Sequence, residues 1–165
     1  MGKIVNPYIG TEGYNCFGCS PGNSMGLAME FFRDGEEIVS EWKPKPLYAG
    51  FKGVLHGGIQ ATLHDEIASW VVFVILKTAG YTTDLQVKYL NPVYLGKGNL
   101  TLKSRLDRME KNIAYIRTTL ADGSGKLCSE SEAVYFTVPA HIATRSFGYP
   151  GIDAFVEKSD RPEIG

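Results

Sequence analysis

The residues whose types and spacing could do chemistry lie in one short stretch. It reads HGGIQATLHDE, in which His56, Gly57 and Gly58 precede a run that carries Asp65 and Glu66. The amino terminus of a helix presents unpaired backbone N–H groups and a partial positive charge, so it can hold an anion or a polarised carbonyl oxygen. Glycine lets a ligand atom approach these donors closely. The pattern therefore indicates an oxyanion hole, although paired glycines can equally end a loop before a helix.

The two carboxylates lie about two turns into the expected helix, among apolar neighbours. Acidic groups are rarely buried without a partner or a purpose. We expect Glu66 to make a surface salt bridge, which is common on amphipathic helices. Asp65 is the candidate general base or nucleophile. His64 lies about 100° round the helix from Asp65 and is expected to face elsewhere.

Gly57 and Asp65 are too far apart on one helix to act together. Eight residues separate them, which corresponds to about 12 Å along the axis at about 1.5 Å per residue. A reacting carbon must lie about 3 Å from its donors and near the base. If both groups act on one substrate, the second must come from another copy of the chain, with the two helices antiparallel across a two-fold axis. The sequence thus predicts at least a dimer.

One helix and six strands are expected to position these residues. No Pro or Gly interrupts residues 59–79, and apolar side chains recur at helical spacing from Ile59 to Val74. The second half of this helix is apolar all round, so other elements must enclose it. The expected strands, separated by turns rich in Gly and Asn, are residues 27–32, 36–42, 82–93, 99–109, 113–121 and 126–138.

The order of these elements predicts an α+β fold. Short connections after the helix imply antiparallel neighbours, because a parallel crossover needs about a dozen residues. A curved antiparallel sheet wrapped around one long central helix is the simplest arrangement. We divide the chain into an irregular N-terminal segment (1–26), one domain (27–138) and a C-terminal tail (139–165) whose place the sequence does not give.

Composition and charge exclude several classes of protein. The chain is 44% hydrophobic and 21% charged, with a net charge of -1, so no overall field favours nucleic acid or an anionic membrane. The longest apolar run, residues 67–76, is well short of the roughly 20 residues that span a bilayer. The amino terminus has no signal-peptide pattern. We expect a cytoplasmic protein that binds neither nucleic acid nor membrane.

Three cysteines do not form a disulfide framework in such a protein. Cys16 and Cys19 have Cys-x-x-Cys spacing, but a structural zinc needs four ligands, and only Cys128 and isolated histidines remain. We expect reduced thiols that pack the N-terminal segment, no bound metal and no cofactor.

Three motifs together resemble a known family. HGGIQATLHDE, the downstream TTDLQVKYLNPV and the upstream NCFGCSPGNSMGLAMEF are similar to the hotdog-fold thioesterase superfamily, in particular the phenylacetate-pathway branch. The resemblance covers about residues 15–138. It implies the hotdog fold and the activity of an acyl-CoA thioesterase that works as a homo-oligomer, either a dimer or a dimer of dimers.

The resemblance also implies roles for single residues. The amide of Gly57 would hold the thioester carbonyl oxygen at a dimer interface, and Asp65 of the partner chain would activate water or attack directly. A hydroxyl on the strand after the helix helps to place the water, and Thr83 or Thr82 is the match; we expect Thr83 to act in catalysis. The residues expected to bind substrate are His56, which fixes the loop, with Gly58, Thr82 and Gly50. Better-known members carry asparagine at the position of Gly50.

Other functions compete with hydrolysis. The same fold could bind acyl-CoA without turnover, as a sensor or carrier, although no DNA-binding segment accompanies the domain. A hydratase or dehydratase would carry aspartate and histidine together in a motif that is not found here. A redox or zinc module on Cys16 and Cys19 is the third alternative. The acyl group, and the choice between dimer and tetramer, are left open by the sequence.

Overall fold

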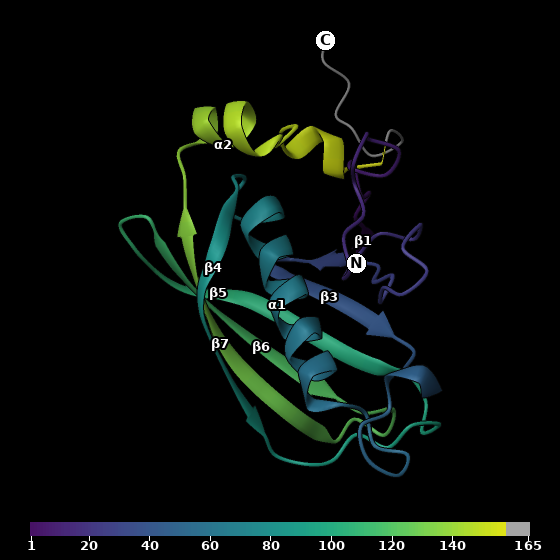
Figure 1. The fold of residues 1–165 in the computed structure, drawn as a ribbon. Coiled ribbons are helices and arrows are strands. Elements are labelled where there is room, and N and C mark those ends of the chain that lie inside the picture. The colour runs from purple at the N-terminus through teal and green to yellow at the C-terminus, as the bar shows by residue number, and fades with distance from the viewer. Residues whose placement is uncertain (158–165) are drawn as a thin grey trace.

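One long helix lies against a curved sheet in the computed structural model, which describes residues 1–157 (Figure 1). Helix α1 (Gly57–Val74) includes the two glycines that were predicted to precede it, and its apolar stripe from Leu63 to Val74 is buried. The helix ends before Ala79 because the backbone turns at Lys77, whose φ of 55° is left-handed. The chain then enters the next strand at Gly80.

Within residues 1–157 the sheet has seven strands, and every neighbouring pair is antiparallel, as the short connections predicted. The spatial order is β1-β2-β3-β5-β6-β7-β4, so β4 lies at one edge. The bounds are β1 (Gly2–Lys3), β2 (Phe32–Asp34), β3 (Glu37–Trp42), β4 (Gly80–Tyr89), β5 (Leu100–Glu110), β6 (Ile113–Ala121) and β7 (Leu127–Thr137). The predicted α+β fold, a curved antiparallel sheet around one helix, is confirmed.

The first predicted strand is wrong for most of its length. Only Phe32 of residues 27–32 belongs to β2, although Leu27, Met29 and Phe31 alternate inward and are buried. The backbone N–H of Leu27 donates to the carbonyl of Phe17, at 2.7 Å, and not to a sheet neighbour. Ala28 has a left-handed φ of 50°, and the N–H of Met29 donates to the carbonyl of Gly18. The alternation of buried residues was therefore predicted correctly, but the segment pairs with the N-terminal turn and not with a strand. A turn at Gly35-Glu36 joins β2 to β3.

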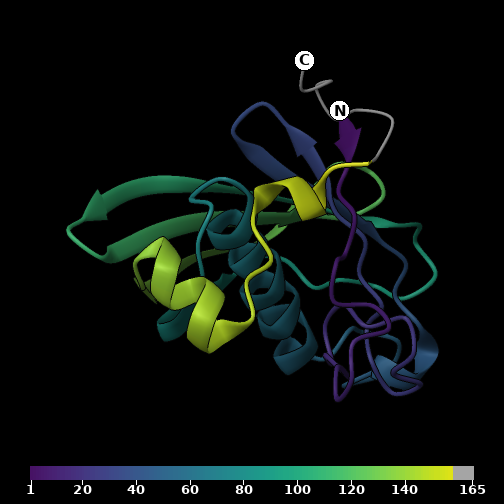
Figure 2. The ribbon, with the colours of Figure 1, turned by 90° about the horizontal axis from the view of Figure 1, so that it is seen from above.

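Residues 139–157 of the C-terminal tail pack against the C-terminal half of α1. They form helix α2 (Ala140–Phe147) and the short 3₁₀ helix η2 (Ile152–Phe155), which lie over the C-terminal end of α1 in Figure 1 and are seen from above in Figure 2. The Phe155 ring lies 5.8 Å from Trp70 and 6.1 Å from Phe73 on α1. Tyr149 donates a 2.8 Å hydrogen bond to the carbonyl of Phe73. The enclosure predicted from the apolar second half of α1 is confirmed, and the tail supplies part of it.

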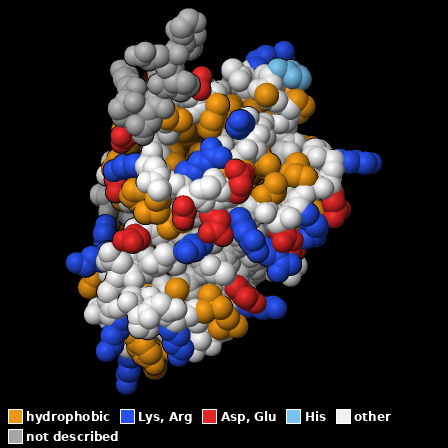
Figure 3. Space-filling view, turned by 180° about the vertical axis from the view of Figure 1, so that it is seen from behind, with side chains coloured by type: hydrophobic (Ala, Val, Ile, Leu, Met, Phe, Trp, Pro, Cys, Tyr) orange, Lys and Arg blue, Asp and Glu red, His pale blue; other side chains and the backbone are white. Residues whose placement is uncertain are grey.

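Acidic and basic side chains are interspersed over the face behind the sheet (Figure 3). Several of them pair across strands: Arg108 and Arg117 both approach Glu132, at 3.4 and 3.8 Å, and Lys88 approaches Glu130 at 3.8 Å. Such exposed pairs are screened by solvent and contribute little to stability. Within the described residues, no helix is long and apolar enough to cross a membrane.

Candidate active site

The amino terminus of α1 is capped by His56. Its Nδ1 accepts a 2.9 Å hydrogen bond from the backbone N–H of Gly58, and its own backbone N–H donates to the carbonyl of Tyr48 at 3.0 Å. Gly50 packs against this residue, since a Cβ there would lie 3.1 Å from the His56 Cα. His56 therefore anchors the loop to the helix, and its part in binding substrate stays a prediction.

The cap leaves the amide of Gly57 free. No acceptor within residues 1–157 takes this N–H, whereas the neighbouring N–H of Gly58 is occupied by His56. The other side of the same residue is held by Tyr89 of β4, whose hydroxyl donates to the Gly57 carbonyl at 2.8 Å. Gly57 is thus oriented from two sides with its donor unpaired. Tyr89 was not among the predicted site residues.

Asp65 is held by two hydroxyls. Thr82 on β4 donates to its Oδ1 at 2.7 Å, and Tyr135 on β7 donates to the same oxygen at 3.0 Å and to the Asp65 carbonyl at 3.0 Å. Burial raises the pKa of Tyr135, and the charge of Asp65 raises it further, so the phenol stays a donor. No donor in the described part of the chain contacts Oδ2. The carboxylate is therefore fixed through one oxygen while the other is free.

The two threonines predicted for the site lie on opposite sides of β4. Thr82 pairs with Tyr135 in the sheet register and faces Asp65. A β-bulge follows, and Thr83 is exposed, with its hydroxyl donating to the carbonyl of Val134 at 3.1 Å. The structure thus brings Thr82, and not Thr83, to the carboxylate. Side chains alternate between the two faces of a strand, so Thr82 and Thr83 could have been expected to face opposite ways. The sequence did not show which of them faces α1.

His64 faces away from the site, as expected from its angle on the helix. It is fully buried, and its ring nitrogens lie 2.8 Å from the hydroxyl oxygens of Ser129 and Ser131 on β7. Burial lowers its pKa to about 4. A neutral imidazole between two serines is a structural part of the core and has no access to a substrate at Asp65.

Glu66 is not in the surface salt bridge that the sequence predicted. No lysine or arginine within residues 1–157 lies within 4 Å of its carboxylate. The carboxylate turns instead toward Cys16, whose Sγ is 3.5 Å from each oxygen, and accepts from the indole N–H of Trp70 at 3.2 Å. The prediction followed the usual behaviour of charges on amphipathic helices, whereas the N-terminal segment brings Cys16 against this face of the helix.

The chain resembles known thioesterases in sequence. The family model of the Thioesterase superfamily matches residues 52–129, which include α1, β4, β5 and β6. A putative esterase of Thermoplasma acidophilum is 29% identical over 84 residues, or 50% of this chain. That match covers 62% of the esterase, less than two thirds of its length. Acyl-coenzyme A thioesterase 13 of Mus musculus is 26% identical over 97 residues, 58% of this chain and 69% of the mouse protein.

Solved structures show the same fold. Zebrafish thioesterase superfamily member 2 superposes with a TM-score of 0.62 at 23% identity, over 71% of this chain and 88% of that one. A hypothetical thioesterase of Streptococcus pneumoniae, crystallised with coenzyme A, gives a TM-score of 0.63 at 21% identity, over 68% of this chain and 87% of that one. The chain therefore has the hotdog fold of thioesterases, as the resemblance implied.

Proposed function

We propose that the chain is an acyl-CoA thioesterase that hydrolyses the thioester with Gly57 and Asp65. The observation that carries the proposal is the pair of unused groups on α1: a free N–H at Gly57 and a free oxygen, Oδ2, on a carboxylate that Thr82 and Tyr135 orient. The similarity to thioesterases, one of them crystallised with coenzyme A, supports the same reaction. The phenylacetate-pathway branch remains our assignment from the sequence motifs.

The proposed reaction needs one donor and one base. The Gly57 N–H binds the thioester carbonyl oxygen and stabilises the negative charge that forms on it. Asp65 removes a proton from water through Oδ2 while the water oxygen attacks the carbonyl carbon. The tetrahedral intermediate then collapses, the C–S bond breaks, and the thiolate of coenzyme A takes the proton from Asp65. Thr82 and Tyr135 are positioning residues, because they contact the carboxylate and not the reacting atoms.

A dimer paired through β4 would bring the two groups together. Among the described residues, this ten-residue strand has a neighbour, β7, on one side only, and a free edge of that length is a ready template for pairing. Thr82 marks the Asp65 end of the strand and Tyr89 marks the Gly57 end. Antiparallel pairing of two copies about a centre between Leu85 and Gln86 would set Thr82 of one copy opposite Tyr89 of its partner. Asp65 of one copy would then approach Gly57 of the other.

The test is an Asp65→Asn variant assayed against short, long and aromatic acyl-CoAs, with release of free coenzyme A as the readout. The variant keeps the size of the side chain and its place beside Thr82, so the dimer should stay folded by circular dichroism and sedimentation. We expect hydrolysis to be lost. Retained turnover would remove Asp65 from the mechanism, and tight binding of acyl-CoA by the unaltered protein without any turnover would favour a non-catalytic binding protein.

A further inference from the structure

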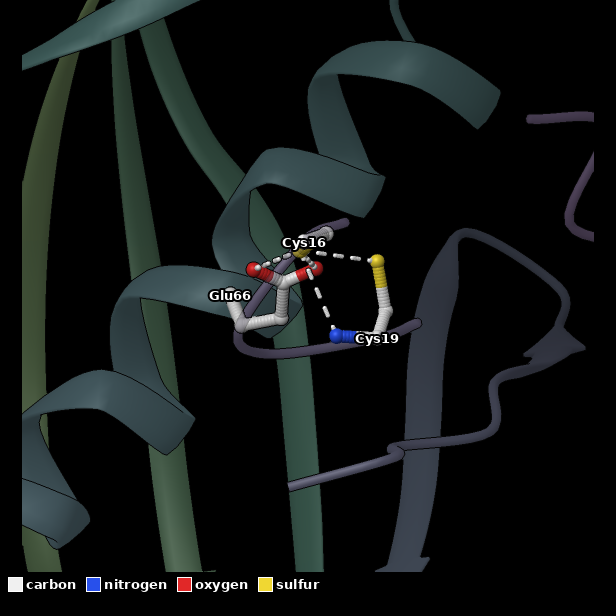
Figure 4. Close-up of side chains that lie close together, drawn as sticks. All are labelled: Cys16, Cys19 and Glu66. Atoms are coloured by element: carbon white, nitrogen blue, oxygen red, sulfur yellow. Dashed lines mark hydrogen bonds between the residues drawn. The ribbon is translucent and has the colours of Figure 1, made fainter. Parts of the chain in front are cut away.

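Two thiols and a carboxylate meet beside α1, and the proposed reaction uses none of them. They belong to Cys16, Cys19 and Glu66, whose sulfur and oxygen atoms all lie within 4.8 Å of one another (Figure 4). Cys16 Sγ is central to the group, 3.5 Å from both Glu66 oxygens and 3.2 Å from Cys19 Sγ. Three acids so close cannot all ionise without a cation between them. No lysine or arginine of the described residues pairs with Glu66 to supply that charge.

The separations from Cys16 to Glu66 and to Cys19 are close to those between ligands of one tetrahedral metal ion, and Cys19 and Glu66 lie within 4.8 Å of each other. Zinc–sulfur bonds of about 2.3 Å and zinc–oxygen bonds of about 2.0 Å place tetrahedral ligands about 3.5 Å apart for sulfur and oxygen, and about 3.8 Å apart for two sulfurs. The distances from Cys16 to Glu66 already have the first value. The two sulfurs, now 3.2 Å apart, need to separate by only about 0.6 Å to reach the second.

Hydrogen-bond donors point at both sulfurs. The backbone N–H of Cys19 donates to Cys16 Sγ at 3.3 Å. The Tyr14 oxygen lies 3.0 Å from Cys19 Sγ and accepts from the Asn6 amide at 2.8 Å, which leaves its own proton for the sulfur. Donors of this kind stabilise thiolates, the form that binds metal, and are the usual second layer of a metal site.

The carboxylate is also positioned. Trp70 donates to Glu66 Oε1 at 3.2 Å, which leaves Oε2 for a ligand role. Gly18, between the two cysteines, is required by this approach, because a Cβ there would meet the Glu66 carboxylate. Any side chain at residue 18 would push the carboxylate from the sulfurs.

We propose that Cys16, Cys19 and Glu66 bind a zinc ion that fastens the N-terminal segment to α1. Two thiolates and one carboxylate select zinc over magnesium or calcium, which prefer oxygen ligands alone. Binding displaces the thiol protons to solvent, and two thiolates with one carboxylate carry three negative charges against the two positive charges of the ion. Solvent takes the fourth position of the tetrahedron. The sequence alone did not lead to this site, because the third ligand is a glutamate 47 residues after Cys19.

The test is the metal content of the whole chain, purified without chelators and without a histidine tag. We expect about one zinc ion per chain by inductively coupled plasma mass spectrometry. Cobalt added to the zinc-free, reduced protein should give thiolate-to-cobalt charge-transfer absorption. Zinc below about a tenth of an equivalent, together with no such absorption, would overturn the proposal; a Cys16–Cys19 disulfide in that metal-free protein would mark a redox pair instead.

Matched variants locate the site. Cys16→Ser and Glu66→Gln should each lose the zinc, whereas Cys128→Ser, which alters the remaining free thiol of the chain, should keep it. Tyr14→Phe removes only the hydroxyl beside Cys19 and should weaken zinc binding about 10- to 100-fold. Equal zinc content in Cys16→Ser and Cys128→Ser would contradict the assignment. The cobalt titration of the unaltered chain decides the matter even where a variant does not fold.

Discussion

Asp65 and Glu66 are adjacent carboxylates on one helix, yet they lie in opposite chemical environments. Asp65 meets hydroxyls from β4 and β7, at the edge of the sheet. Glu66, about 100° further round the helix, meets thiols from the N-terminal segment and the indole of Trp70. A carboxylate that accepts hydrogen bonds from hydroxyls can still act as a base. A carboxylate beside two thiols can instead share a metal ion with the thiolates. The partners, which come from distant parts of the sequence, therefore decide what each carboxylate can do.

The largest effect on activity is expected from a substitution of Asp65 that leaves the surroundings of Glu66 unchanged. Asp65→Asn removes the proposed base and should lower kcat/KM by about 100- to 10,000-fold, the usual contribution of a general base. Zinc content should not change, because the substitution leaves Glu66 beside the thiols. Hydrolysis of acyl-CoA and elemental analysis on one preparation give both readings. Loss of zinc together with activity would show that the two carboxylates act as one site.

His64, the residue before this pair, should make stability depend on pH. Its pKa in the folded chain, about 4, lies below the ordinary value of 6.5, because burial disfavours the charged ring. The unfolded chain therefore takes up the proton first, and stability present above pH 6.5 is lost as the pH falls toward 4. The loss from this group is about 3 kcal/mol over that window. NMR titration of the imidazole tests the cause; a midpoint near 6.5 would contradict the buried, uncharged ring.

The sequence predicted those features that depend on local pattern. The start of α1, its buried stripe and five of the strands follow from periodicity and turn residues, and β6 has the predicted bounds, 113–121. His64 was placed correctly from its angle on the helix. The part of the candidate site at the start of α1, His56 with Gly57 and Gly58, could also be predicted, because a capping residue and glycines before a helix form a local signal in the sequence.

The rest depended on contacts that no local pattern contains. The bulge after Thr82 decides which threonine meets Asp65, and a bulge changes the phase of a strand without a clear signal in its residues. Glu66 was predicted to lie at the surface because its partners, Cys16 and Cys19, lie 50 and 47 residues earlier in the chain. The tail over α1 was unplaced for the same reason.

The two threonines give the next largest effect. Thr82→Val removes the 2.7 Å hydrogen bond to Asp65 Oδ1, and a bond to a charged group is worth about 1.5–3 kcal/mol, or about 10- to 100-fold in kcat/KM. Thr83→Val makes the same chemical change on the exposed side of β4 and should alter kcat/KM by less than about twofold. The reverse order of effects would restore Thr83 to the role that the sequence suggested.

The smallest effect concerns the other end of α1, where Tyr89 holds the carbonyl of Gly57. Tyr89→Phe removes that 2.8 Å hydrogen bond, which at an exposed residue is worth about 0.5–1.5 kcal/mol, so kcat/KM should fall about 2- to 10-fold. Tyr81→Phe is the matched control, because Tyr81 is equally exposed on β4 and, within residues 1–157, its hydroxyl makes no hydrogen bond. A loss confined to Tyr89→Phe would mean that the free amide needs orientation from the strand as well as the cap. Equal values for both variants would mean that His56 alone sets the geometry of Gly57.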